Sequence, residues 1–199
     1  MNAGTRAAAA YDELKRLLLS GEFAPAQRLD PVRLASALAT GVTPIREALL
    51  RLAGERLVEL GLNTGFHMPM VTESTLLGLY RWNLDLLRLA LRSRVWKPDA
   101  ARHERIFQAE PLSADVLFLS VAEWSRRPEL IAQIASANDR LAIPRIAEAA
   151  ALDYARAELN DMAHAANDPT SALRTITAYH QIRTKTVRHI VIEIYKMND

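Results

Sequence analysis

The sequence predicts a mostly α-helical protein, in which an N-terminal winged helix-turn-helix is followed by a C-terminal antiparallel helical bundle. Two short amphipathic helices meet at a glycine-containing turn between residues 34 and 56, and a glycine-bearing hairpin follows them. This order is typical of a DNA-binding head whose second helix lies in the major groove. After residue 71, apolar residues recur at helical spacing and no segment alternates as a strand does, which predicts the bundle.

The composition suits a two-domain protein and excludes several classes. A chain of 199 residues, half of them hydrophobic, can bury the cores of two small domains. No run of 18 apolar residues occurs and the N-terminus lacks a secretory signal, so we expect a cytoplasmic protein with no membrane partner. The absence of cysteine excludes a disulfide framework and a thiolate metal site. With a formal net charge of only +2, DNA binding requires positive residues gathered on one face.

The first elements have clear local signals. Residues 6–20 are Ala-rich with apolar residues at helical spacing, and Gly21 is placed to end that helix. Residues 28–29 form a short extended piece that is expected to pair with the strands of the wing. Asp30 as N-cap and Pro31 at the first helical position predict the start of the next helix.

The recognition helix is predicted over residues 44–56. Thr43 can cap its first turn, and Pro44 suits the first position because its missing N–H has no intrahelical partner there. Its apolar residues share one side and leave Arg46 on the outer side. The wing is completed by a strand, a turn and a returning strand, over residues 57–60, 61–65 and 66–71.

The second half opens with Thr72 or Ser74 as the cap of a long helix, and polar or proline-containing turns separate the helices that follow. The predicted helices cover residues 75–94, 99–107, 114–125, 128–141, 145–166 and 170–196. We therefore expect a winged helix-turn-helix domain over residues 6–71 and an all-helical domain over residues 74–199.

The run from Tyr11 to Val71 resembles the winged-helix domain of the GntR family of bacterial transcription regulators. The matching pieces are GEFAPAQRL at 21–29, RLASAL at 33–38, TPIREALLRLAGERLVE at 43–59 and NTGFHMPMV at 63–71. The helical remainder resembles, more weakly, the FCD ligand-binding domain of the FadR-type branch. The resemblance implies a homodimer that binds double-stranded DNA at a palindromic operator and senses a small organic acid in its helical domain.

The resemblance also implies which residues meet DNA, namely Arg33, Thr43, Arg46, Thr64, Gly65 and His67; for His67, a surface position without a role is the alternative. Two residues depart from the family pattern. An arginine that commonly reads a guanine edge is replaced by Val42, which cannot donate hydrogen bonds to a base. The arginine expected at the wing tip is Thr64. We therefore expect an altered or relaxed operator, with loss of DNA binding as the alternative.

The FCD pattern places an Asp and three His residues in the bundle, where they hold a divalent metal that grips a carboxylate effector. The resemblance puts Asp115 at the Asp position, Glu158 near the middle His and His180 at the last His, whereas Leu119 stands at the first. Carboxylates and imidazole bind hard or borderline cations, so the first three form a weak metal-site candidate. Each also has a plain explanation, as a helix-start residue, a solvated helix-face residue and a hydrogen-bonded histidine respectively.

We therefore expect no firmly bound cofactor, with a divalent metal as the less favoured possibility. Without a metal, an acidic effector needs cationic side chains, and guanidinium pairs with carboxylate bidentately. The candidates are Arg88, Arg92 and Arg183, for each of which simple surface exposure is the alternative.

Catalysis finds no support in the sequence. It contains no Gly-rich phosphate loop, no Gly-x-Ser-x-Gly elbow, no His-Glu-x-x-His and no cysteine nucleophile. We predict a ligand-responsive DNA-binding regulator rather than an enzyme. The alternatives are a degenerate regulator, acting as a protein-interaction or DNA-architecture module without an effector metal, and, least supported, an enzyme that uses the bundle cavity.

Overall fold

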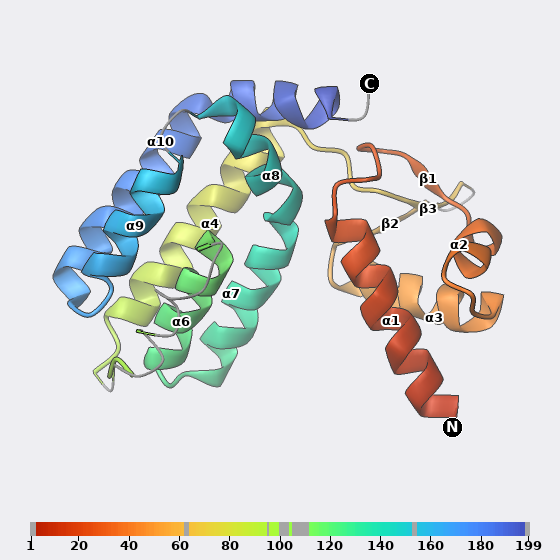
Figure 1. Ribbon diagram of the computed structural model, residues 1–199, viewed down its shortest axis with the longest axis horizontal. Helices are drawn as coiled ribbons and strands as arrows, with labels where there is room; N and C mark the ends of the chain where they lie inside the picture. The colour runs from red at the N-terminus through yellow and green to blue at the C-terminus, as the bar shows by residue number, and fades with distance from the viewer. Residues whose placement is uncertain are drawn as a thin grey trace. The chain divides into compact units, whose positions relative to one another are not determined.

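The computed structural model describes residues 3–61, 64–94, 96–99, 104, 112–152 and 155–197 (Figure 1). The chain divides into two compact units. Unit 1 comprises Met1–Val71 together with Ile194–Asp199, and unit 2 comprises Thr72–Glu193. Each unit has its own core and is described by itself.

Unit 1 is a winged helix-turn-helix. Its elements in chain order are α1 (Ala3–Leu19), β1 (Arg28–Leu29), α2 (Pro31–Ala37), α3 (Val42–Gly54), β2 (Glu59–Gly61) and β3 (Gly65–His67). The three strands form an antiparallel sheet in the order β1-β3-β2, so the expected pairing of residues 28–29 with the wing is confirmed. The core is formed by buried side chains from all three helices, among them Leu14 and Leu18 of α1, Leu34 of α2, and Ile45 and Leu49 of α3.

Local signals account for the ends of α1 and the start of α2. Gly21 has a φ of 86°, the left-handed conformation that glycine adopts without steric cost after a helix. Asp30 accepts backbone hydrogen bonds from Val32 at 2.8 Å and Arg33 at 3.4 Å. With Pro31 at the first position, this is the predicted cap.

The recognition helix α3 begins earlier than predicted. Gly41 is its N-cap, and no side chain accepts a hydrogen bond from the first turn, so the expected capping role of Thr43 is wrong. Thr43 instead lies inside the first turn and is exposed. The helix ends at Gly54, since Arg56 takes a left-handed φ of 61° that cannot continue an α-helix.

The strands of the wing are shorter than predicted, because Leu57 and Val58 are buried beneath the sheet region rather than paired in it. The hairpin is tight. A Cβ at Gly61 would lie 2.0 Å from Thr64 Oγ1, and Gly65 has a φ of 84°. Both glycines are therefore required by the turn. Residues 62–63 lie outside the described part of the chain.

Unit 2 is an antiparallel helical bundle. Its described helices are α4 (Glu73–Leu91), α6 (Ala114–Trp124), α7 (Pro128–Arg140), α8 (Ala142–Ala151), α9 (Ala155–Ala165) and α10 (Pro169–Lys196), the last of which runs on into the residues grouped with unit 1. Helices α4, α6 and α7 pack on one another, and α9 runs beside α10 (Figure 1). Most of the short helix expected over residues 99–107 lies outside the described residues.

The start of α4 is capped as predicted. The Thr72 hydroxyl accepts from the Thr75 backbone N–H at 3.1 Å, and the Thr75 hydroxyl lies 3.0 Å from the Thr72 backbone nitrogen, which donates to it. This reciprocal pair is a capping box with Thr in place of the usual Glu.

The single helix expected over residues 145–166 is wrong. The structure has two helices, and the chain leaves the helical conformation at Leu152, which has φ −135° and ψ 120°. No Gly or Pro marks the break, so sequence periodicity did not reveal it. Among the described residues, no helix is long and apolar enough to span a bilayer.

Candidate nucleic-acid interface and buried polar core

Helix α3 has a fully buried inner side and an exposed outer side that carries polar residues. Ile45, Leu49 and Leu52 have no exposed surface, which fixes the rotation of the helix and leaves Thr43 and Arg46 exposed. Within the described part of the chain, Arg46 makes no hydrogen bond and no ion pair. Its guanidinium is therefore available to an external partner, at the helix start from which helix-turn-helix proteins reach base edges.

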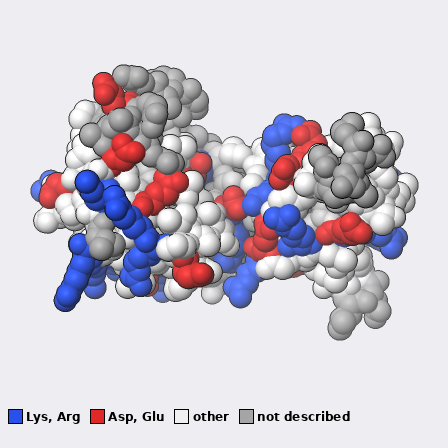
Figure 2. Space-filling model, turned by 90° about the horizontal axis from the view of Figure 1, so that it is seen from below, with Lys and Arg blue, Asp and Glu red and all other residues white. Residues whose placement is uncertain are grey.

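Few Lys and Arg side chains of unit 1 are, like Arg46, exposed and free of an ion pair. Residues 1–71 contain 8 Lys and Arg and 7 Asp and Glu, a net charge of +1. Three of these cations form ion pairs inside the unit, in the pairs Lys15–Glu55, Arg16–Glu13 and Arg51–Glu55. Figure 2 likewise shows Lys and Arg interspersed with Asp and Glu on the face displayed. Among the described residues, the exposed cations of this unit that lack an ion pair are Arg28, Arg33, Arg46 and Arg56.

The wing contributes a second polar surface. Thr64 is exposed at its tip, beside Gly65. His67 lies on the central strand β3, paired in register with Arg28 on one side and Glu59 on the other. Its Nδ1 donates to the Gly65 carbonyl at 3.2 Å, which leaves Nε2 for an outside partner. Arg28 was not among the predicted DNA contacts. The expected pairing of residues 28–29 with the wing would have placed it beside His67.

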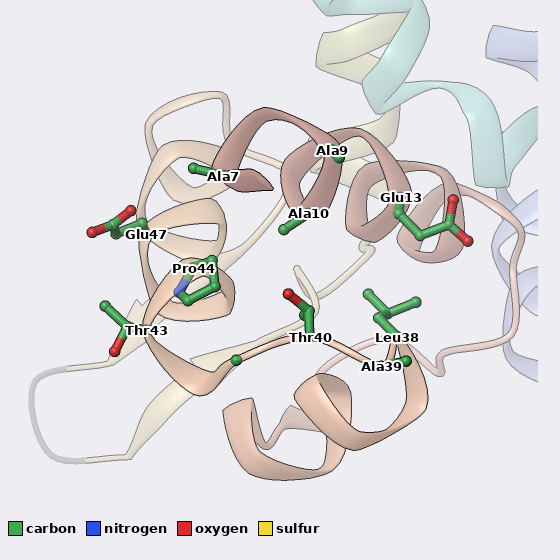
Figure 3. Close-up of a pocket in the computed structure, with 11 residues that line it drawn as sticks. Ala7, Ala9, Ala10, Glu13, Leu38, Ala39, Thr40, Thr43, Pro44 and Glu47 are labelled. Carbon is green, nitrogen blue, oxygen red and sulfur yellow. The ribbon is translucent and has the colours of Figure 1, made fainter. Parts of the chain in front are cut away.

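A hollow of about 1070 Å³ lies beside the helix-turn-helix, between the first half of α1 and the α2–α3 turn (Figure 3). Small side chains such as Ala7 and Ala10 leave the space open. Glu13 and Glu47 stand at its rim, and none of its described lining residues is Lys or Arg. The hollow is therefore unsuited to a phosphate, and the candidate DNA contacts lie on the outer side of α2 and α3 and on the wing.

The centre of unit 2 contains polar side chains in a shell of apolar ones. His180 is 1% exposed, and burial lowers its pKa from 6.5 to about 3, so the ring is neutral. Its Nδ1 donates to the Ile176 carbonyl at 2.7 Å, so Nε2 carries the lone pair. That atom lies 2.9 Å from Asn83 Oδ1, while Asn83 Nδ2 has no partner, so exchanging the amide oxygen and nitrogen gives the Asn83 NH₂ as donor to His180.

A second buried group surrounds Arg183, which is 1% exposed. Its Nε donates to Glu148 Oε2 at 2.9 Å, and its Nη1 donates to Glu158 Oε2. Glu148 also accepts from Tyr80 at 2.6 Å and from Tyr179 at 3.0 Å. Burial and the neighbouring Glu148 charge raise the pKa of both tyrosines, so their hydroxyls remain donors.

The fold and these surfaces can now be compared with known proteins. Residues 6–67 match the model of the bacterial regulatory proteins, gntR family. The winged helix-turn-helix of unit 1 is therefore similar to the DNA-binding domain of that family. The transcriptional repressor GlaR of Escherichia coli is 35% identical over 124 residues, which cover 59% of this chain and 56% of GlaR. The chain thus spans little more than half the length of that relative.

Two solved structures share the fold of both units. Escherichia coli McbR/YncC has a TM-score of 0.73 at 19% identity, with both chains covered completely. A GntR transcriptional regulator from Rhodococcus sp. has a TM-score of 0.73 at 17% identity, over 92% of this chain and 98% of the other. GlaR is a transcriptional repressor, and the family matched by residues 6–67 is one of bacterial regulatory proteins.

The metal that the FCD resemblance implies does not fit the residues present. Asp115 is exposed on α6, Glu158 is bound by Arg183, and the lone pair of His180 faces Asn83. Among the described residues, no group of three His, Asp or Glu side chains is placed to hold a metal ion. The candidate trio is not assembled, because the first turn of α6 turns Asp115 away from the core.

The three arginines suggested as an effector clamp are also not brought together. Arg92 is exposed, Arg88 is paired with Asp85 at 3.4 Å, and both Nε and Nη1 of Arg183 already donate to glutamates. Sequence reasoning missed Arg145 on α8. Its Nε and Nη1 are buried without a hydrogen bond, and no carboxylate pairs with it among the described residues. No local motif distinguishes this arginine from a surface one.

The surroundings of Arg145 are aromatic and neutral. Its guanidinium carbon lies 5.3 Å from the centre of the Phe118 ring, and its Nη2 donates to Asn138 at 3.0 Å. Phe118 in turn stacks on His180 with ring centres 5.4 Å apart. A half-buried cation with two shielded, unused donors and no counter-ion is suited to an anion.

Proposed function

We propose that this protein is a GntR-type transcription regulator that binds a palindromic operator as a homodimer and responds to a small organic acid. Residues 6–71 bind double-stranded DNA, and residues 74–199 form an FCD-like domain that binds the effector and dimerises. The effector acts on the spacing of the two DNA-binding heads, since a ligand favours the arrangement to which it binds more tightly.

The observation that carries the DNA part of the proposal is the free guanidinium of Arg46 on the outer side of α3. It stands in the TPIREAL segment at 43–49, next to the exposed Thr43. Arg33 on α2 and the wing residues Thr64, Gly65 and His67 complete the proposed contact surface. Because unit 1 has a net charge of only +1, loss of a single contacting arginine removes a large part of the attraction.

The test is Arg46→Ala on a duplex selected for binding from a random library. We expect a loss of about 1–3 kcal/mol if Arg46 contacts a base. Arg16→Ala is the matched control, because it removes the same formal charge from an exposed arginine that Glu13 already neutralises. Fluorescence anisotropy measures both. Equal affinity of the Arg46 variant and the wild type, with the fold intact, would remove Arg46 from the interface.

We assign effector binding to Arg145 instead of the predicted clamp of Arg88, Arg92 and Arg183. Its unused Nε and Nη1 lie on different edges of the guanidinium, so either can donate to a carboxylate oxygen, while Phe118 and neutral His180 suit an apolar or aromatic remainder. Both nitrogens are shielded from solvent, so a ligand reaches them only when α8 moves. That movement would couple the effector to the rest of the bundle.

The Arg145 site is tested by pairing each carboxylic acid of a small library with its uncharged primary amide. We expect acids, and not amides, to raise the melting temperature, because a ligand that binds only the folded state stabilises it. Arg145→Gln should weaken acid binding by about 10- to 100-fold. Arg174→Gln, an exposed arginine of the same unit, is the control. Acids that bind the Arg145 variant as well as the wild type would contradict the assignment.

The second candidate function is a degenerate regulator that acts as an architectural or protein-interaction module. Val42 in the turn and Thr64 at the wing tip favour it, because neither can supply the charged contacts of an arginine. Sequence preference, measured at a fixed salt concentration, separates the two functions. Specific binding should show a selected duplex preferred over random sequence at the same salt concentration. An architectural module should bind both equally.

A further inference from the structure

Arg183 is held by groups from three helices. The side chain belongs to α10, Glu148 belongs to α8 and Glu158 to α9. Its Nη1 also donates to the Tyr179 carbonyl at 3.3 Å, and its guanidinium carbon lies 3.5 Å from the centre of the Tyr179 ring. The arginine is thus surrounded by oxygen atoms and an aromatic face, in the way that a bound cation is.

The two carboxylates depend on this cation to different degrees. Glu148, with 5% of its side chain exposed, has two tyrosine hydroxyls besides Arg183. The other oxygen of Glu158, Oε1, is buried without a hydrogen bond, so Arg183 is the one hydrogen-bonding partner of that side chain among the described residues. Removing Arg183 would leave two negative charges in a medium where uncompensated charge is expensive.

The geometry also explains the break between α8 and α9. Ten residues of continuous helix would separate Glu148 from Glu158 by about 15 Å along the axis. Both carboxylates contact one guanidinium only because the chain turns at Leu152. The shared cation and the turn therefore belong to one arrangement.

We propose that the Arg183 guanidinium is a built-in structural cation of unit 2, which neutralises Glu148 and Glu158 and ties α8 and α9 to α10 in the way that a bound divalent ion would. This inference is independent of the proposed DNA function. A metal does not fit these residues, and the inference adds that the Arg183 guanidinium balances the charge of the two glutamates in place of a metal. It also implies that Arg183 positions α8, and with it Arg145, without touching an effector.

The test uses the full chain and tryptophan fluorescence, because Trp82, Trp96 and Trp124 all belong to unit 2. Wild-type protein should keep its melting temperature with EDTA and with added ZnCl₂ or MnCl₂. Arg183→Ala should lower the melting temperature by roughly 6–20 °C, the loss expected for an uncompensated buried charge. The variant, unlike the wild type, should be stabilised by Zn²⁺ or Mn²⁺, which then have two carboxylates and no competing guanidinium.

The decisive control is the triple variant Arg183→Ala, Glu148→Gln, Glu158→Gln. It lacks the cation but also both charges, so it should melt above Arg183→Ala and show no response to the metals. If Arg183→Ala does not fold, recovery of folding in the triple variant supports the proposal. The proposal is overturned if the wild type responds to metal or EDTA. It is equally overturned if the melting temperature of Arg183→Ala equals that of the wild type, or if neither metal raises it. The same holds if the melting temperature of the triple variant is no higher than that of Arg183→Ala.

Discussion

His180 and Arg183 lie less than one turn apart on α10, are equally buried, and keep different charge states. His180 is neutral because burial lowers the pKa of its ring, and the nearby positive charges of Arg145 and Arg183 lower it further. Burial alone would also lower the pKa of Arg183, but Tyr179, Glu148 and Glu158 outweigh that effect and the net pKa is raised. A buried group keeps its charge only where counter-charges are supplied.

The neutral state of His180 predicts a pH dependence of stability. Its pKa is 6.5 when unfolded and about 3 when folded, so between these values the unfolded state binds a proton that the folded state does not. The contribution is complete above pH 6.5 and is lost as the pH falls below it. We expect the unfolding free energy of unit 2 to fall by about 1.4 kcal/mol per pH unit below pH 6.

Urea denaturation followed by tryptophan fluorescence at pH 7, 6 and 5 measures this slope. His180→Gln should reduce the slope by the equivalent of one proton. His189→Gln, at an exposed position of the same helix, should leave it unchanged. Identical slopes for the wild type and the His180 variant would show that His180 is not the buried neutral group.

At the scale of the elements, helix starts in this protein are stabilised by different means. The start of α2 uses the Asp30 side chain and that of α4 the reciprocal Thr72 and Thr75 pair, whereas α3 starts at Gly41 with no side-chain cap. In the first turn of α3, Pro44 has no N–H, so one fewer donor needs a partner there.

The capping box predicts the effect of a single substitution. Thr72→Ala removes the acceptor for the Thr75 N–H and should cost about 1 kcal/mol of unit 2 stability. Thr72→Ser keeps the hydroxyl and should cost less than half of that. Thermal melts of the two variants by tryptophan fluorescence test the difference. Equal loss for Ala and Ser would mean that the methyl group, and not the cap, matters.

At the scale of the whole molecule, we propose that the dimer forms on an exposed face of α4. Trp82 and Leu89 lie seven residues apart on one side of the helix and are 46% and 47% exposed. Asp85 lies between them, with Arg81 and Arg92 on either side along the helix. Two copies of this face packed antiparallel about a two-fold axis would bring Trp82 of each copy onto Leu89 of the other, so the apolar groups are self-complementary.

We therefore predict that the protein sediments as a dimer at micromolar concentration. Trp82→Glu places a charge in the centre of the proposed face and should give a monomer that still folds, because the side chain is exposed. Ile146→Glu, at an exposed apolar position of α8, should remain dimeric. Sedimentation velocity distinguishes these outcomes. A monomeric wild type, or an unchanged dimer in Trp82→Glu, would refute this interface.

The sequence by itself determined the features whose causes are local. Asp30-Pro31, the TPIREAL segment and the hairpin glycines act within a few residues, so they identified the winged helix, its family and the exposed position of Arg46. Tertiary structure alone decided the α8–α9 break, the bridging role of Arg183 and the burial of Arg145. Glu148 and Glu158 lie 35 and 25 residues from Arg183, so their meeting depends on which helix faces pack together, and no periodicity in the chain encodes that.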